Sequence, residues 1–255
     1  LYLTYRHYPV DDPKVAGAYG EWKDYNAYSD FISSEGVPVF YARVDHVSVP
    51  LAQEGTGQVV VDFTPEPLTQ DVSFVFHIEK TADVVVDSLT AEISGIPSTM
   101  ELTTGLILAQ KTYKLLFRPT YAALPSAADS ASAEALRCEA SVNIPGIVRS
   151  HTEDMVTGPG ILQIAIYTHY DYEEEGTQRK AAKVFHAGIN LYHTLKERKS
   201  LQWDEEENGY RQASRSITVE IGSPLNIDKD GILNGGSTST GLDQWIPGET
   251  FEIEV

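Results

Sequence analysis

The chain has 255 residues and a hydrophobic fraction of 42%, which is enough for one large domain or two ordinary domains with proper cores. Its 37 acidic and 19 basic residues give a net charge of -18, which argues against nucleic acid as a partner, since that binding needs clustered Lys and Arg. The sequence contains no apolar run of 18 residues and therefore predicts no membrane span.

Residues 1–52 are predicted to form an N-terminal β segment that ends in the strand VFYARVDHVSVPL. Within it, residues 11–36 are aromatic and polar and indicate a long loop or a short helical excursion. Four aromatic side chains crowd ten residues of this stretch, and such rings can stack on the faces of sugars. Two interpretations stay open: a loop that contacts a ligand, or rings that fold back to cap the sandwich end, which we favour. These residues are Tyr19, Trp22, Tyr25 and Tyr28.

Apolar and polar residues alternate through most of residues 53–234, which is typical of antiparallel strands with one buried face. Turn-forming stretches such as SGIPS, TGPG, EENG and DKDG separate these runs. The pattern predicts an all-β antiparallel sandwich as the main domain, without a sustained helix. The residues predicted to face inward are Val59, Val61, Phe63, Val72, Phe74, Phe76, Ile78, Tyr113, Leu115, Phe117, Leu162, Ile164, Ile166, Phe185, Ala187, Ile189, Leu191, Ile217, Val219 and Ile221.

Two stretches interrupt this alternation. Residues 123–134 are rich in small residues and predict an exposed loop, and residues 196–213 predict a hairpin with a mixed-charge tip. The run KVFHAGINLYHTL is interpreted as one strand, with His186 and His193 on opposite faces.

The sequence offers no motif for catalysis, so no enzyme activity, catalytic residue or cofactor is predicted. Cys138 alternates in phase with apolar neighbours and is interpreted as a buried core thiol. The DKDG stretch reproduces half of a calcium loop, but Ser237 stands where the closing Glu is expected, so Asp228 and Asp230 are predicted to form a turn without a metal. The acidic clusters at 173–175 and 204–207 are likewise interpreted as solvated turns.

Residues 235–255 are predicted to form a flexible hinge followed by a C-terminal strand. Phe251, Ile253 and Val255 share one face of this strand and are expected to be buried against a sandwich, while Trp245 is predicted to set the register of the strand. The strand either completes the chain's own sheet or pairs with another chain. We expect it to dock on its own molecule when the chain is isolated, because an unpaired apolar edge invites aggregation.

Two stretches resemble fimbrillin-like anchor and accessory proteins. One is VDSLTAEISGIPSTMELTTG, from Val86 to Gly105, and the other is the tail, in which a Gly pair and Asp243-Gln244-Trp245 precede the last strand, Phe251–Val255. The resemblance implies an exported lipoprotein at the outer-membrane surface of a Gram-negative cell. It further implies two transthyretin-like β-sandwich domains, the first short or incomplete, and a place in a pilus as subunit, anchor or tip.

The implied partners are other pilus subunits, with a host or microbial surface glycan or protein as a further partner. The alternative is a surface glycan-binding β-sandwich lipoprotein that does not assemble into a pilus. A third interpretation, a jelly-roll glycoside hydrolase, would need two carboxylates about 5–9.5 Å apart in a groove.

Overall fold

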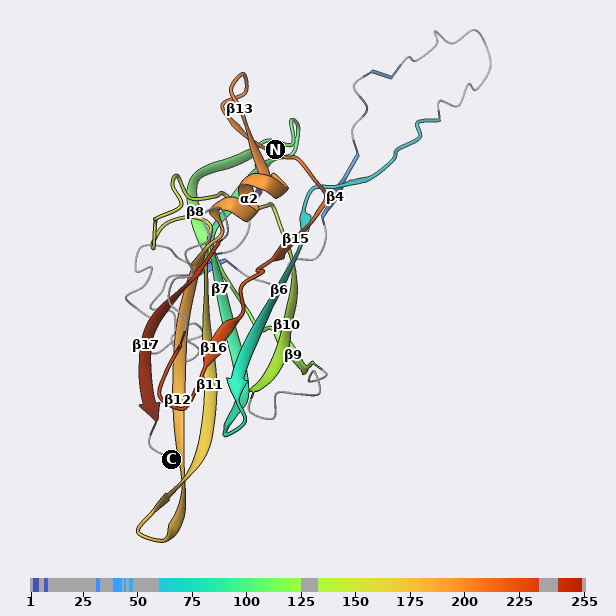
Figure 1. The fold of residues 1–255 in the computed structure, drawn as a ribbon. Helices are drawn as coiled ribbons and strands as arrows, with labels where there is room; N and C mark the ends of the chain where they lie inside the picture. The colour runs from blue at the N-terminus through green and yellow to red at the C-terminus, as the bar shows by residue number, and fades with distance from the viewer. Residues whose placement is uncertain are drawn as a thin grey trace, which may run out of the picture.

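The computed structural model describes residues 60–124, 133–233 and 243–253, together with residues 2–4, 7–8, 31–32, 39–42, 44 and 46–47 of the N-terminal part. Over these residues the structure is almost entirely β, with one short helix, and the predicted all-β fold is confirmed. Two large, mainly antiparallel sheets curl and pack face to face to form the sandwich (Figure 1).

The first sheet carries the C-terminal strand as its outermost member. Its order is β13 (Leu201–Asp204), β14 (Gly209–Gln212), β8 (Ile107–Phe117), β7 (Val84–Glu101), β11 (Ile161–Glu174), β12 (Thr177–Asn190) and β17 (Trp245–Ile253). Short strands of the N-terminal part extend the same sheet: β1 (Tyr2–Thr4) pairs with β7, and β3 (Phe31–Ile32) pairs with β8 and with β2 (His7–Tyr8).

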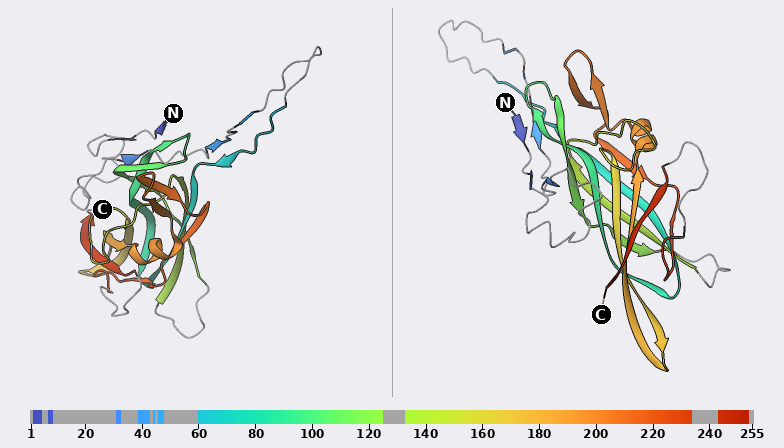
Figure 2. Two further views of the ribbon diagram at one scale, coloured as in Figure 1. Left: turned by 90° about the horizontal axis from the view of Figure 1, so that it is seen from above. Right: turned by 90° about the vertical axis from the view of Figure 1, so that its left-hand side faces the viewer.

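The second sheet covers the inner face of the first. It consists of β15 (Ser216–Glu220), β6 (Gln70–Thr81), β10 (Ala133–Ile144) and β9 (Thr120–Ala123), with β16 (Leu225–Ile227) also pairing with β6. β15 and β16 run parallel to β6, unlike the other pairs of this sheet. A separate two-stranded ribbon, β4 (Phe40–Tyr41) with β5 (Glu66–Pro67), lies beside one end of the sandwich (Figure 2), where Tyr41 packs against the small cluster of Leu68, Met100 and Ile107.

The core between the sheets is made of the residues that alternate inward along their strands. Phe74 of β6 stacks on Phe117 of β8 with ring centroids 5.0 Å apart, so the two sheets meet through aromatic contacts. Cys138 is fully buried beside them, as predicted. Of the residues predicted to face inward, those confirmed as buried are Val72, Phe74, Phe76, Ile78, Tyr113, Leu115, Phe117, Leu162, Ile164, Ile166, Phe185, Ala187, Ile189, Leu191, Ile217, Val219 and Ile221.

The strand predicted over Val59–Phe63 is wrong for the four residues of it that the structure describes. Residues 60–63 belong to no strand, and the side chains of Val60 and Phe63 are 71% and 59% exposed. Alternation alone predicted this strand, but no neighbouring strand pairs with it in the described part of the chain.

The predicted SGIPS turn is also wrong, because β7 continues through it from Val84 to Glu101. The pairing of β7 with β8 is irregular at two places, Ser94/Ile96 and Pro97/Thr99. These irregularities accommodate residues that would break a regular ladder of hydrogen bonds. Gly95 has a φ of +89°, and a Cβ there would lie 2.5 Å from the carbonyl oxygen of Val148. The glycine therefore marks a bulge where the backbone of the β10–β11 connection approaches closely.

A short helix replaces the end of the strand predicted over KVFHAGINLYHTL. β12 ends at Asn190, and α2 runs from Tyr192 to Arg198. Leu191 and Leu195, four residues apart, are both buried, and Lys196 and Arg198 lie in the last turn, where cations complement the helix dipole. His193 therefore lies on the helix and not on the strand face opposite His186.

The predicted turns are confirmed at 204–207 and at Asp228–Asp230, whereas of the stretch 173–175 only Glu175 lies in a turn, because β11 continues to Glu174. Oδ1 of Asp204 accepts hydrogen bonds from the backbone N–H groups of Glu206 and Glu207 in the β13–β14 hairpin. Oδ1 of Asp228 accepts bonds from the N–H groups of Asp230 and Gly231, both at 2.8 Å. These are Asx turns, in which the side chain stabilises the reversal of the backbone. Most of the loop predicted at 123–134 lies outside the described residues.

Candidate functional site at the C-terminal strand

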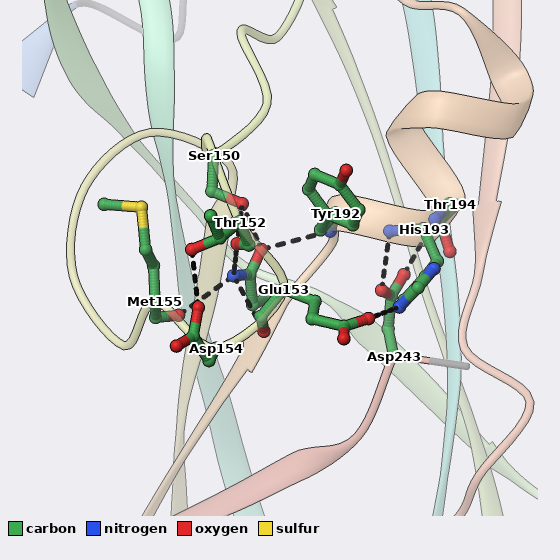
Figure 3. Close-up of polar contacts among 10 residues, drawn as sticks. Ser150, Thr152, Glu153, Asp154, Met155, Tyr192, His193, Thr194 and Asp243 are labelled. Carbon is green, nitrogen blue, oxygen red and sulfur yellow. Dashed lines mark hydrogen bonds and ion pairs between the residues drawn. The ribbon is translucent and has the colours of Figure 1, made fainter. Parts of the chain in front are cut away.

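The chain segment that leads into β17 caps the N-terminus of α2. One carboxylate oxygen of Asp243 accepts a hydrogen bond from the backbone N–H of His193 at 2.9 Å, and the other accepts from that of Thr194 at 3.0 Å (Figure 3). The residue that precedes the helix, Leu191, has no side-chain oxygen for this purpose. Asp243 therefore performs from 50 residues away the capping that a local Ser or Asp usually performs.

Two residues later, Trp245 enters the core. Its side chain is 3% exposed, and its ring meets that of Phe76 edge to face at 5.8 Å between centroids. The indole Nε1–H donates a 2.9 Å hydrogen bond to the carbonyl oxygen of Ser223. Trp245 also lies opposite Ile189 of β12, at the start of the pairing between β12 and β17. That it sets the register of the strand stays a prediction. We call Asp243 and Trp245 together the clasp.

The loop at residues 150–155 is bound to the same end of the molecule through Asn190. The side-chain amide of Asn190 donates to the carbonyl oxygens of Thr152, Glu153 and Met155, while its oxygen accepts from Ser150 Oγ at 2.7 Å. His193 Nε2 lies 2.7 Å from a carboxylate oxygen of Glu153 (Figure 3). The clasp thus rests on a helix that is itself held by a satisfied polar network.

A bulge after the clasp changes the direction of the side chains. Between Ala187 and Phe185 of β12 there is one residue, whereas between their partners Pro247 and Thr250 of β17 there are two. The extra residue shifts the alternation, so residues on either side of the bulge that would share a face in a regular strand do not.

Gly248 lies at this bulge. A Cβ there would lie 3.0 Å from both Cβ and the carbonyl oxygen of His186, so the glycine permits β17 to approach β12 closely.

The structure differs here from the expectation that Phe251 faces the core. Phe251 pairs with Val184, on the outer face of the sheet, and its half-buried ring meets that of His186 at 5.3 Å. Glu252 is 82% exposed in its side chain and lies 3.6 Å from Lys183 Nζ. Ile253, opposite Ala182, is the last described residue, and Val255 lies outside the described residues.

The strand thus has two unlike halves. The first half is anchored by the clasp. In the second half, Thr250–Ile253 pairs with β12 from Phe185 to Ala182, with Phe251 half-buried on the outer face and Glu252 exposed. β17 is also the last strand of its sheet, because in the described part of the chain no strand pairs with its other edge. An exposed edge of this kind is where another strand can be added.

The other predicted site is not placed by the structure. Tyr19, Trp22, Tyr25 and Tyr28, the predicted ligand-contact loop, lie outside the described residues. Among the residues that are described, no group of three or more His, Cys, Asp or Glu side chains is arranged to hold a metal ion. Burial raises the pKa of the Cys138 thiol to about 12, so this cysteine is not poised as a nucleophile.

Sequence reasoning missed Asp243 as a helix cap and Asn190 as the residue that binds the 150–155 loop. For Asp243 the sequence signal was weak, since a cap donated from 50 residues away has no fixed spacing. For α2 the signal was present, in the Leu191/Leu195 spacing and the basic residues Lys196 and Arg198.

Comparison of the chain with models of protein families, with curated proteins and with solved structures finds no match. No helix in the described ranges combines the length and the apolar character needed to cross a bilayer. The fold defines an all-β sandwich, whose C-terminal strand is clasped at its start and pairs with β12 on both sides of a bulge.

Proposed function

We propose that this chain is a non-catalytic subunit of a cell-surface fibre, and that the half of β17 after the bulge makes the contact between subunits by pairing with a neighbouring sheet. The observation that carries the proposal is the division of β17 into a first half anchored by buried Trp245 and a second half, beyond the bulge, whose Phe251 faces the outside of the sheet. Strand addition suits such a segment, because the backbone supplies the hydrogen bonds whichever sheet it joins.

The clasp supports this proposal because it keeps the strand attached to its own subunit. Trp245 is a fully buried aromatic side chain, whose burial contributes roughly 1.5–3 kcal/mol by area, and Asp243 satisfies two N–H groups of α2. A strand held this firmly at its start can release its end without leaving the molecule.

The contacts of the second half support release at a low cost. Half-burial of Phe251 contributes roughly 1 kcal/mol. Glu252 is exposed and lies 3.6 Å from the buried Lys183, so this ion pair contributes between about 0 and 1 kcal/mol. A neighbouring sheet that offers an equivalent ladder and an equivalent apolar contact restores both terms. The free-energy change for moving the second half of β17 from its own sheet to a neighbouring sheet is therefore close to zero.

The resemblance of the Asp243-Gln244-Trp245 tail to fimbrillin-like proteins supports the surface of a Gram-negative cell as the location and other pilus subunits as the partners. It also supports two transthyretin-like domains, the first short or incomplete, as the domain organisation. This proposal allows three places in the fibre: an adhesive tip, a stalk subunit or an anchor.

The test is deletion of residues 249–255, which leaves the clasp intact. We expect a fall in Tm of only a few degrees, because the deletion removes about 1–2 kcal/mol of side-chain contacts. Incorporation into surface fibres, measured by immunogold labelling of the producing cells, is expected to be lost. A matched control shortens the exposed β11–β12 hairpin by replacing residues 173–178 with Asn-Gly, and it is expected to retain incorporation. Normal incorporation of the 249–255 deletion would contradict the proposal.

A further inference from the structure

A cavity of about 470 Å³ lies at the end of the sandwich near α2, away from the second half of β17. Its walls come from the β10–β11 connection at residues 147–151, from α2 and from the β13–β14 hairpin. Small-molecule sites in proteins occupy about 300–1,000 Å³, so the cavity is large enough for a small ligand.

The charge of this cavity is opposite to that of the protein. Arg149, Lys196 and Lys199 line it, and no Asp or Glu does, although the chain carries a net charge of -18. In the described part of the chain none of these three cations is paired with a carboxylate, whereas Lys80, Lys114 and Arg211 are. The helix dipole accounts for Lys196, but Arg149 comes from a different segment. The arrangement therefore suits an anion.

Aromatic rings accompany the cations. Trp203 lines the cavity with 51% of its surface exposed, and Tyr210, opposite it in the hairpin, supports it edge to face at 4.9 Å between ring centroids. Arg149 and Lys196 lie over the ring of Tyr192, at 5.3 and 5.5 Å from its centroid, which positions both cations. An exposed, supported Trp face suits the C–H face of a sugar ring.

We propose that this cavity binds an acidic saccharide, a sugar carrying a carboxylate or a sulfate group. Trp203 stacks against the sugar ring, and Arg149, Lys196 and Lys199 bind the anionic group. Arg149 matches a carboxylate or sulfate through paired N–H donors, and the two ammonium groups add charge. Because the net charge of the whole chain repels anions, the attraction is confined to this site and weakens as salt screens it. The site is independent of strand exchange by β17.

Substitution of Lys199 can distinguish an effect on ligand binding from an effect on folding. Lys199 ends α2 in the left-handed conformation, with a φ of +52°, which Gly adopts without strain. Lys199→Gly is therefore expected to keep Tm unchanged or to raise it, while it removes one cation from the cavity wall. A loss of binding in this variant cannot be attributed to unfolding.

The experiment is calorimetric titration of the full chain at low salt with digalacturonate, with a sulfated heparin disaccharide, with neutral cellobiose and with inorganic sulfate. We expect at least one acidic disaccharide to bind about tenfold or more tightly than cellobiose, and its affinity to fall as salt rises from about 50 to 200 mM. Trp203→Ala and Arg149→Gln are each expected to weaken this binding about tenfold, and Lys199→Gly about threefold. The controls Lys180→Gln and Tyr172→Ala, at the exposed β11–β12 hairpin, are expected to leave it unchanged.

Three results would overturn the proposal. The first is equal affinity for cellobiose or for inorganic sulfate, because the sugar and the charge must both contribute. The second is acidic-saccharide binding that survives Trp203→Ala and Lys199→Gly unchanged, which would place the ligand elsewhere. The third is absence of binding by both acidic disaccharides at low salt in a chain whose Tm shows that it is folded.

Discussion

Replacement of Asp243 by Ala removes the two acceptors that cap α2 at the N–H groups of His193 and Thr194. The loss of an N-terminal cap costs about 0.5–2 kcal/mol in proteins. Here two backbone N–H groups lose their acceptor, and Asp243, which supplies it, is only 8% exposed. We therefore expect Asp243→Ala to lower the free energy of unfolding by about 2 kcal/mol. For a domain of this size, this loss corresponds to a fall in Tm of about 4–8 °C.

Urea unfolding followed by circular dichroism measures this loss, with two variants for comparison. Asp243→Asn keeps one acceptor oxygen and is expected to lose about half as much. Glu173→Ala, at the exposed hairpin, is expected to change the stability by less than about 0.5 kcal/mol. A loss below about 0.5 kcal/mol for Asp243→Ala would refute the capping of α2 by the tail, and with it the clasp.

Three further predictions concern buried titratable groups. Burial lowers the pKa of His186 to about 4, whereas its pKa in the unfolded chain is about 6.5. Between these two pH values the unfolded chain binds more protons than the folded chain. The free energy of unfolding is therefore expected to fall by up to about 3 kcal/mol as the pH drops from about 6.5 to 4. Urea midpoints between pH 7 and 4 test this, and His186→Gln is expected to flatten the profile. Burial raises the pKa of Cys138 to about 12, so its thiol is expected to resist a thiol reagent at pH 8 until the protein unfolds, and stability is expected to fall between about pH 9 and 12. Lys114→Met leaves the buried Glu92 without the ammonium group 2.8 Å away and is expected to cost about 3–5 kcal/mol, most of which Glu92→Leu in the same chain recovers.

The alternation of apolar residues was sufficient to predict the two sheets and their shared core. Along β6, Val72, Phe74, Phe76 and Ile78 face inward as predicted, because burial of one face of a strand requires a period of two. The same rule fails at Phe63, which was predicted to face inward with Val59 and Val61 but is exposed and has no strand beside it in the described part of the chain. A sequence pattern shows that a stretch can be a strand, but pairing decides whether it is one.

The geometry of the tail could not be predicted from its own residues. The bulge beside Gly248 depends on His186, more than 60 residues earlier, and it moves Phe251 from the core face to the outer face. The role of Asp243 depends on a helix that sequence reasoning did not find. Both features arise from contacts between distant segments, which local spacing does not encode.

The most direct test of strand exchange is the disulfide pattern of fibres made from Val184→Cys/Phe251→Cys, with Cys138→Ala to leave only this pair. The two positions lie directly opposite each other on β12 and β17. In the isolated chain we expect an intramolecular disulfide between them, since paired strands bring their Cα atoms within about 4.4–6.8 Å. In assembled fibres we expect intermolecular disulfides that link subunits into ladders on a non-reducing gel, and the chain oxidised before assembly is expected not to be incorporated. Fibres that contain only intramolecular disulfides would contradict the account, because β17 would then remain on its own sheet.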